Sequence, residues 1–176
     1  IRIELRSDLC MANGDGFGSV IDTDICTDSL GIPYIPARRI KGVLKAAAEY
    51  IEADKTVEIF GITGESDSGS LKVSDGYIEG YDELKAEINK HDDMNSEQVT
   101  RLFTDVKAAT AIDDDGHAKD NSLRFTRVLE NSLPWNRNEN VVFYAETDID
   151  ETYADELERI CKALRHIGYK RNRGYG

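Results

Sequence analysis

The sequence predicts an α+β fold, in which short strands form a sheet and helices pack against it. Apolar and polar residues alternate in residues 1–7 and 71–78, and this alternation has the period of a strand with one buried face; residues 141–147 are predicted as a third strand. In residues 38–51 and 153–164 the apolar residues recur every three or four positions, as in an amphipathic helix. The two patterns are interleaved along the chain, which indicates one mixed fold.

The first strand, residues 1–7, has an apolar side chain at every second position. Residues 11–18 then contain three glycines and Asn13, and no helical periodicity appears before residue 35. We expect a long ordered loop with short extended pieces there. Loops of this length in compact domains are usually functional.

Helical signals dominate the next part of the chain. Pro36 stands at the start of the helix predicted over 38–51, a position that proline favours. Residues 62–70 are rich in Gly and Ser and lead into the strand at 71–78. Residues 82–91 and 96–103 have the composition of short helices, the second with Ser96 as its N-cap.

A polar segment, residues 105–134, predicts a projecting β-hairpin arm inserted into the domain. Asp113 to Gly116 form a turn signal, and residues 122–129 alternate as a strand. Within that strand, Phe125 and Arg127 either face RNA or pack in the ordinary way. Trp135 follows the arm, and we interpret it as an anchor at the arm's base. After the strand at 141–147, the helix at 153–164 ends with Gly168 as its expected C-cap.

The elements follow the order strand, helix, strand, strand, helix, with a last strand expected beyond Gly176. This is the order of a ferredoxin-like, or RNA-recognition-motif-like, antiparallel sheet with two helices on one face. We therefore expect a single domain over residues 1–176 that carries the arm and is a fragment of a longer chain.

Composition excludes several classes of protein. No apolar run approaches the roughly 18 residues of a membrane span, so we expect a cytoplasmic protein without a membrane partner. The cysteines and histidines are few and scattered, which argues against a disulfide framework, a zinc cluster or a visible catalytic triad. They are Cys10, Cys26, Cys161, His91, His117 and His166.

The end of the chain is basic although the protein carries a formal net charge of −12. Glycines allow close backbone approach to a ligand, while arginine and tyrosine grip phosphates and stack on bases. The segment therefore indicates a nucleic-acid partner, and the alternative is a solvated tail with an accidental basic run. The acidity of the whole chain opposes nucleic-acid binding unless cations cluster locally. The residues concerned are Gly168, Tyr169, Lys170, Arg171, Arg173, Gly174 and Tyr175.

A second basic cluster lies at the start of the helix predicted over 38–51. Arg38, Arg39 and Lys41 stand at the positive end of the helix dipole, and Lys45 lies one turn further on. Cations cost a few tenths to about 1 kcal/mol each at that end, so an anion is expected nearby. A phosphate would meet free N–H groups and cations together. The alternative is pairing with an acidic residue elsewhere.

Acidic residues precede this helix at Asp22, Asp24 and Asp28. In an extended segment Asp22 and Asp24 share a face about 7 Å apart, so both could approach one hydrated Mg²⁺ or one scissile phosphate. Judged by spacing alone, a solvated loop with Asx turns is the stronger interpretation.

Several of these segments together resemble the RAMP superfamily, whose members form the RNA-binding backbone of type III CRISPR effector complexes. The resemblance spans nearly the whole chain. It depends on residues 20–24, on the Pro-Tyr-Ile-Pro and Lys-Gly elements of 33–42, and on 59–61 followed by 69–75. Ala37-Arg38-Arg39 departs from the small residues common there and looks more like larger or fused members.

The resemblance implies that the helix start and the glycine loop hold guide RNA and that the arm wedges into the guide–target duplex. It also implies that a loop aspartate supports metal-dependent cleavage of target RNA. We carry this role over to Asp22, which we expect to bind Mg²⁺ and to act in catalysis. Asp24 is the second candidate for the catalytic role.

The resulting hypothesis is a guide-RNA-binding backbone subunit or domain with metal-dependent endoribonuclease activity, working with guide RNA, target RNA and other RAMP-type subunits. Two alternatives stay open. One is a non-catalytic structural subunit of the same kind of complex. The other is a repeat-processing nuclease that uses His166 for general acid–base catalysis.

Overall fold

The computed structural model describes residues 1–11, 21–62, 69–91 and 93–168. The chain divides into two compact units. The first unit comprises the described residues of Ile1–Ile3, Tyr34–Glu79 and Val142–Ile167. The second unit comprises Gly168 and the described residues of Glu4–Pro33 and Gly80–Val141. No helix in this described part of the chain is long and apolar enough to cross a membrane.

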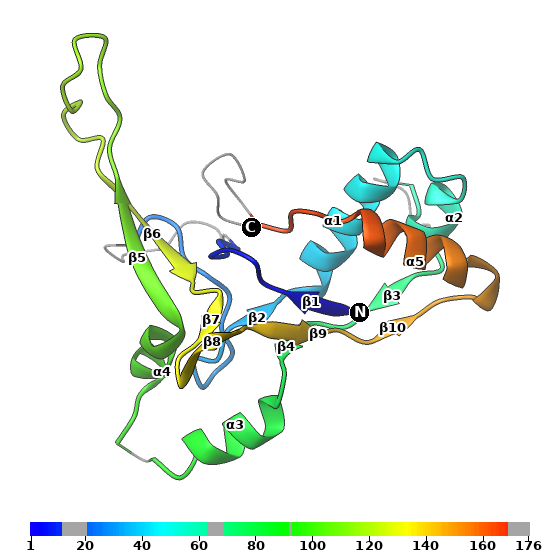
Figure 1. Ribbon diagram of the computed structural model, residues 1–176, viewed down its shortest axis with the longest axis horizontal. Helices are drawn as coiled ribbons and strands as arrows, with labels where there is room; N and C mark the ends of the chain where they lie inside the picture. Colours follow the sequence, from blue (N-terminus) through cyan, green and yellow to red (C-terminus); the bar gives the residue numbers. More distant parts are fainter. Residues whose placement is uncertain (12–20, 63–68, 92, 169–176) are drawn as a thin grey trace. The chain divides into compact units, whose positions relative to one another are not determined.

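A four-stranded sheet forms the centre of the first unit (Figure 1). Its strands lie in the order β1 (Arg2–Glu4), β9 (Val142–Tyr144), β4 (Gly76–Ile78) and β2 (Tyr34–Ile35). The pairs β4–β9 and β2–β4 are antiparallel. A separate antiparallel pair joins β3 (Lys72–Val73) to β10 (Thr147–Asp148).

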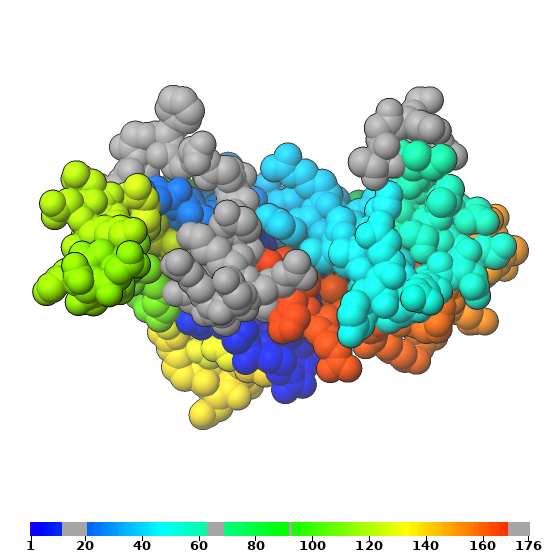
Figure 2. Space-filling model, turned by 90° about the horizontal axis from the view of Figure 1, so that it is seen from above, coloured from blue at the N-terminus to red at the C-terminus, as the bar shows by residue number. Residues whose placement is uncertain are grey.

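Three helices belong to the same unit: α1 (Ala37–Tyr50), α2 (Thr56–Phe60) and α5 (Ala154–Ala163), the last entered through the 3₁₀ turn η1 (Glu151–Tyr153). In the space-filling view, α5 lies directly against α1 (Figure 2). Ile40 and Leu44 on α1 and Phe143 on β9 are almost completely buried. Gly76 lets β4 approach α1 closely, because a Cβ there would lie 3.2 Å from Ile40 Cδ1.

The helix predicted over 38–51 is therefore present as α1, but the expected end of α5 is wrong. Leu164, not Gly168, is the C-cap, and its φ of −67° and ψ of 121° have already left the helical region. Glycine was expected because it commonly ends helices, yet a non-glycine residue ends one equally well by turning to extended backbone.

The second unit contains α3 (Tyr81–Ile88), α4 (Ser96–Phe103) and two hairpins. The hairpins are β5 (Thr104–Ala109) with β6 (Arg124–Leu129), and β7 (Ser132–Leu133) with β8 (Asn136–Asn140). The N-cap of α4 is Asn95, and the prediction of Ser96 is wrong by one residue. Asn95 and Gln98 form a capping box in which each side chain accepts the other's backbone N–H at 2.9 Å.

The long hairpin β5–β6 lies where the arm was predicted, and its strands pair without interruption from Thr104–Leu129 to Ala109–Arg124. Figure 1 shows its outer half extending away from α4. The acidic turn forms as expected, because Gly116 N–H donates to Asp113 O at 3.1 Å with Gly116 at a φ of 85°. Trp135 makes an edge-to-face contact with Phe103, centroid to centroid 6.0 Å, at the inner end of β5.

Mixed helices and small antiparallel sheets thus confirm the α+β class.

Gly31 gives a stability test of the second unit. Its φ is 89°, and a Cβ there would lie 2.0 Å from Ser96 O on α4. We expect Gly31→Ala to lower the free energy of unfolding by about 2 kcal/mol or more. The control is Gly42→Ala on α1, where a Cβ meets nothing within 4 Å. It should raise the free energy by up to about 1 kcal/mol. Urea unfolding would measure both, and an unchanged Gly31→Ala midpoint would contradict the assignment.

Candidate functional site

The loop that carries Asp22 and Asp24 lies along β6, within the second unit. Thr23 forms a parallel bridge with Thr126. Asp22 N–H donates to Phe125 O at 2.9 Å, and Arg127 N–H donates to Thr23 O at 2.9 Å. The loop therefore contains the short extended piece that the sequence predicts, and the hairpin strand fixes its position.

Asp22 is exposed at the surface of this loop. Its Oδ2 accepts a hydrogen bond from Phe125 N–H at 2.7 Å, and its Oδ1 lies 3.7 Å from Arg124 Nε. The backbone of β6 thus holds one carboxylate oxygen, while the other forms an ion pair with a guanidinium.

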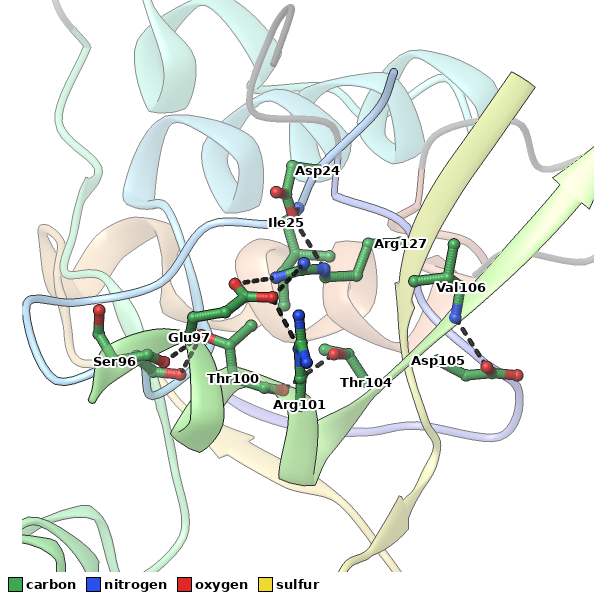
Figure 3. A network of polar contacts seen from close by, with 11 residues as sticks. Asp24, Ile25, Ser96, Glu97, Thr100, Arg101, Thr104, Asp105, Val106 and Arg127 are labelled. Carbon is green, nitrogen blue, oxygen red and sulfur yellow. Dashed lines mark hydrogen bonds and ion pairs between the residues drawn. The ribbon is translucent and has the colours of Figure 1, made fainter. Parts of the chain in front are cut away.

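Asp24 points into a polar network below the loop (Figure 3). Its Oδ1 accepts from Ile25 N–H at 2.8 Å and lies 3.5 Å from Arg127 Nε. The distance to Arg127 is that of an ion pair, and Arg127 Nε has no hydrogen-bond partner among the described residues. Asp24 therefore compensates a buried cation.

Arg127 is the centre of the network, and only 9% of its side chain is exposed. Two of its nitrogens donate to Glu97 on α4, at 2.9 and 2.8 Å. Arg101 Nε donates to the same carboxylate at 3.0 Å. Of the two interpretations that the sequence left for Arg127, ordinary packing is what the structure shows. The sequence did not reveal the network, because its residues lie far apart along the chain.

The network also shifts pKa values. The hydrogen bond from Arg127 is the main cause of the lowered pKa of Glu97, with Arg101 adding to it and burial opposing it. Burial acts to lower the pKa of Arg127, but the hydrogen bond to Glu97 and the charges of Asp24 and Glu97 outweigh it and raise that pKa. Both side chains are therefore charged at neutral pH.

Asp28 has a structural part in the same loop. Its Oδ1 accepts from Leu30 N–H and Ile32 N–H, both at 2.9 Å, and its Oδ2 accepts from Tyr81 O–H at 2.7 Å. These contacts form an Asx turn. At Asp28 the alternative interpretation of the acidic loop, a loop with Asx turns, therefore holds.

Among the described residues, no three His, Cys, Asp or Glu side chains gather as a metal site. The donor set at Asp22 fits a different kind of site. Mg²⁺ is commonly bound by one or two carboxylates together with water and substrate phosphates. Asp22 Oδ1 could contribute one such ligand, so an ion there would depend on RNA for the rest.

The basic start of α1 lies in the first unit and combines two kinds of residue. Lys41 Nζ donates to Leu71 O at 2.9 Å and Lys45 Nζ to Gly61 O at 3.1 Å. Burial, and then the charge of Lys45, lower the pKa of Lys41. These two lysines thus hold the chain's own backbone, while Arg38 is exposed and Arg39 is half-buried.

An anion already sits at the N-terminus of α1. Asp75 Oδ1 accepts a hydrogen bond from Ala37 N–H at 2.7 Å. A carboxylate near the first turn of a helix is favoured by the helix dipole. Asp75 therefore supplies part of the negative charge that the sequence led us to expect at this position.

The C-terminal loop falls almost wholly outside the described residues. Gly168 is described and buried. The other members of the predicted loop are not described: Tyr169, Lys170, Arg171, Arg173, Gly174 and Tyr175. The aspartates belong to the second unit and the start of α1 to the first, so each unit carries a candidate surface of its own.

Comparison with known proteins places this chain in a family. The sequence profile of the RAMP superfamily matches residues 2–176. The chain belongs to the RAMP superfamily. This confirms the resemblance drawn from the helix-opening and glycine-containing segments. No curated protein matches this RAMP protein.

Solved structures with the same fold include chains of the Type III-B Cmr-beta. One comes from a cryo-EM structure bound to cognate target RNA, with a TM-score of 0.70, 12% identity, and coverage of 98% of this chain and 92% of that chain. Another comes from the apo state, with a TM-score of 0.70, 14% identity, and coverage of 99% and 93%. At this identity the likeness shows the fold of the RAMP protein alone.

The Glu97–Arg127 pair predicts a pH-dependent stability. Because the pKa of Glu97 falls below its ordinary 4.5 on folding, its contribution is fully present above about pH 4.5 and is lost as pH falls through the folded value. We expect Glu97→Gln to be less stable than wild type by about 1–2 kcal/mol at pH 7, since Glu97 is partly exposed.

That difference should shrink at pH 3, measured by urea unfolding at each pH. Glu139→Gln, at an exposed position on β8, is the control and should match wild type at both pH values. A wild-type advantage over Glu97→Gln that is constant from pH 7 to pH 3 would contradict the ion pair.

Proposed function

We propose that this RAMP protein is a guide-RNA-binding backbone subunit, or domain of one, in a type III CRISPR complex that targets RNA. The observation that carries the proposal is the family match over residues 2–176. The fold shared with Type III-B Cmr-beta bound to target RNA supports it. The partners would be guide RNA, target RNA and other RAMP-type subunits.

The first unit would be the ferredoxin-like core of such a subunit. Helix α1 stands between β1 and β4 along the chain, directly after the short strand β2 at the other edge of the sheet, and β9 lies between β1 and β4 in the sheet. This order supports a split β-α-β arrangement, in which α5 would be the second helix, after β9. A strand beyond the described residues would complete the sheet in this proposal.

Guide RNA would contact the start of α1 chiefly through Arg38, whose side chain is exposed. Arg39 and the basic C-terminal loop would add to this contact. Lys41 and Lys45 would add positive charge to the surface, but their ammonium groups are bound to backbone carbonyls. They would therefore contribute less than the arginines.

Target cleavage would take place at Asp22. A divalent ion, when bound, would supply positive charge at the scissile phosphate. Phe125 N–H holds Oδ2 of the Asp22 carboxylate, so a ligand would bind at Oδ1, in place of its ion pair with Arg124. The nucleophile would be the 2′-hydroxyl of the target RNA itself, so no protein nucleophile is needed. Asp24 is the weaker candidate, because its carboxylate compensates Arg127.

A second candidate function is a subunit that holds guide RNA without cutting the target. The hydrogen bond and the nearby guanidinium at Asp22 favour it, because they give this carboxylate a purely structural use. The two candidates differ in whether the assembled complex cleaves RNA when Mg²⁺ is added.

Arg38 tests the guide-binding surface. We expect Arg38→Ala to weaken binding of guide RNA and to reduce the slope of log affinity against log salt by about one. The control is Lys162→Ala on α5, an exposed cation of the same unit, which should leave the slope unchanged. Filter binding across a salt series would measure both. Equal slopes for Arg38→Ala and wild type would remove α1 from the binding surface.

Asp22 tests the cleavage step. Asp22→Asn keeps an oxygen to accept from Phe125 N–H but loses the charge, so it should retain the fold and guide binding. We expect cleavage of target RNA by the assembled complex to fall at least about 100-fold, as for loss of an electrostatic contribution to the transition state.

The control is Asp93→Asn, at an exposed position of the second unit, and it should cleave at the wild-type rate. Undiminished cleavage by Asp22→Asn would refute the assignment. No cleavage by wild type in Mg²⁺ would select the non-catalytic subunit, and metal-independent cleavage lost in His166→Ala would select acid–base catalysis.

A further inference from the structure

The outer face of the four-stranded sheet carries a row of tyrosines. Tyr34 on β2 lies opposite Tyr77 on β4, and Tyr77 lies opposite Tyr144 on β9. Side chains directly opposite each other on neighbouring strands project from the same face. The next pair, Ile78 and Phe143, is buried and points to the other face. We call Tyr34, Tyr77 and Tyr144 the tyrosine row.

The tyrosine row presents aromatic surface to solvent. Tyr77 is 36% exposed and Tyr144 is 46% exposed. The rings of Tyr34 and Tyr77 are stacked, with centroids 6.1 Å apart and planes 28° from parallel. The two rings therefore lie nearly parallel beside each other on this face.

Carboxylates flank the tyrosine row. Glu79 Oε1 accepts a hydrogen bond from Tyr144 O–H at 3.2 Å, which places this carboxylate on the same face. Glu146 follows Tyr144 by two residues along extended backbone, so it points to the same side. Arg2 extends the row, because Ile1 and Ala145 exchange hydrogen bonds and set Arg2 opposite Tyr144. Two carboxylates against one guanidinium leave the face negative.

We propose that the tyrosine row, together with Glu79 and Glu146, binds an arginine-bearing segment of a partner protein. A guanidinium is planar, packs on aromatic rings and donates paired hydrogen bonds to carboxylates. Tyrosine and arginine are both enriched in the buried centres of protein interfaces. The negative charge of this face selects a cationic segment from among protein partners.

Nucleic acid fits the same face less well. The carboxylates of Glu79 and Glu146 would repel phosphates. This docking surface is therefore distinct from the RNA contacts proposed at α1 and Asp22, and its test does not depend on them.

The experiment uses the full chain with ¹³C-labelled tyrosine and three probes. They are a five-residue peptide with arginines at its second and fourth positions, the same peptide with citrulline in their place, and a short single-stranded oligouridine. We expect the arginine peptide to shift the NMR signals of the tyrosine row and to bind about tenfold more tightly than the citrulline peptide.

Glu79→Gln should weaken binding of the arginine peptide about fivefold without disturbing the fold, since Glu79 is exposed. Tyr77→Leu should abolish binding of the arginine peptide. Tyr50→Leu, which changes a tyrosine of α1 that is 83% exposed, should leave this binding unchanged. Equal binding of the two peptides, preferential binding of oligouridine to the row, or no shift with the arginine peptide would each overturn the proposal.

Discussion

The buried Arg127 guanidinium links three elements of the second unit. A buried cation is costly unless it is paired with opposite charge. Arg127 finds Glu97 on α4 and Asp24 on the preceding loop, while its own backbone belongs to β6. One side chain thereby joins a loop, a helix and the long hairpin.

The same interaction positions the acidic loop. Asp24 is directed inward by Arg127, and the backbone of the loop is bonded to Phe125 and Arg127 on β6. These backbone hydrogen bonds fix the extended piece that contains Asp22. The place of Asp22 at the surface therefore does not depend on packing of its own side chain. A residue held in this way can be replaced by an isosteric amide without loss of the loop.

Local sequence patterns predicted the regular elements well and the site less well. Helix α1 and the hairpin β5–β6 follow from periodicity and turn residues, which act over a few positions. The N-cap at Asn95 and the C-cap at Leu164 differ from the expected residues because cap choice depends on backbone geometry at one position. Asp75 at the start of α1 and Glu97 against Arg127 were missed, since contacts between distant segments leave no local pattern.

Lys41 and Lys45 have a further consequence for the chain between Gly61 and Leu71. The two ammonium groups bind the carbonyls at both ends of this segment, and at Gly69 a Cβ would lie 2.4 Å from Gly61 N. The two ends of the segment are therefore held next to each other by side chains of one helix, so their position depends on α1, the helix whose apolar face packs in the first unit.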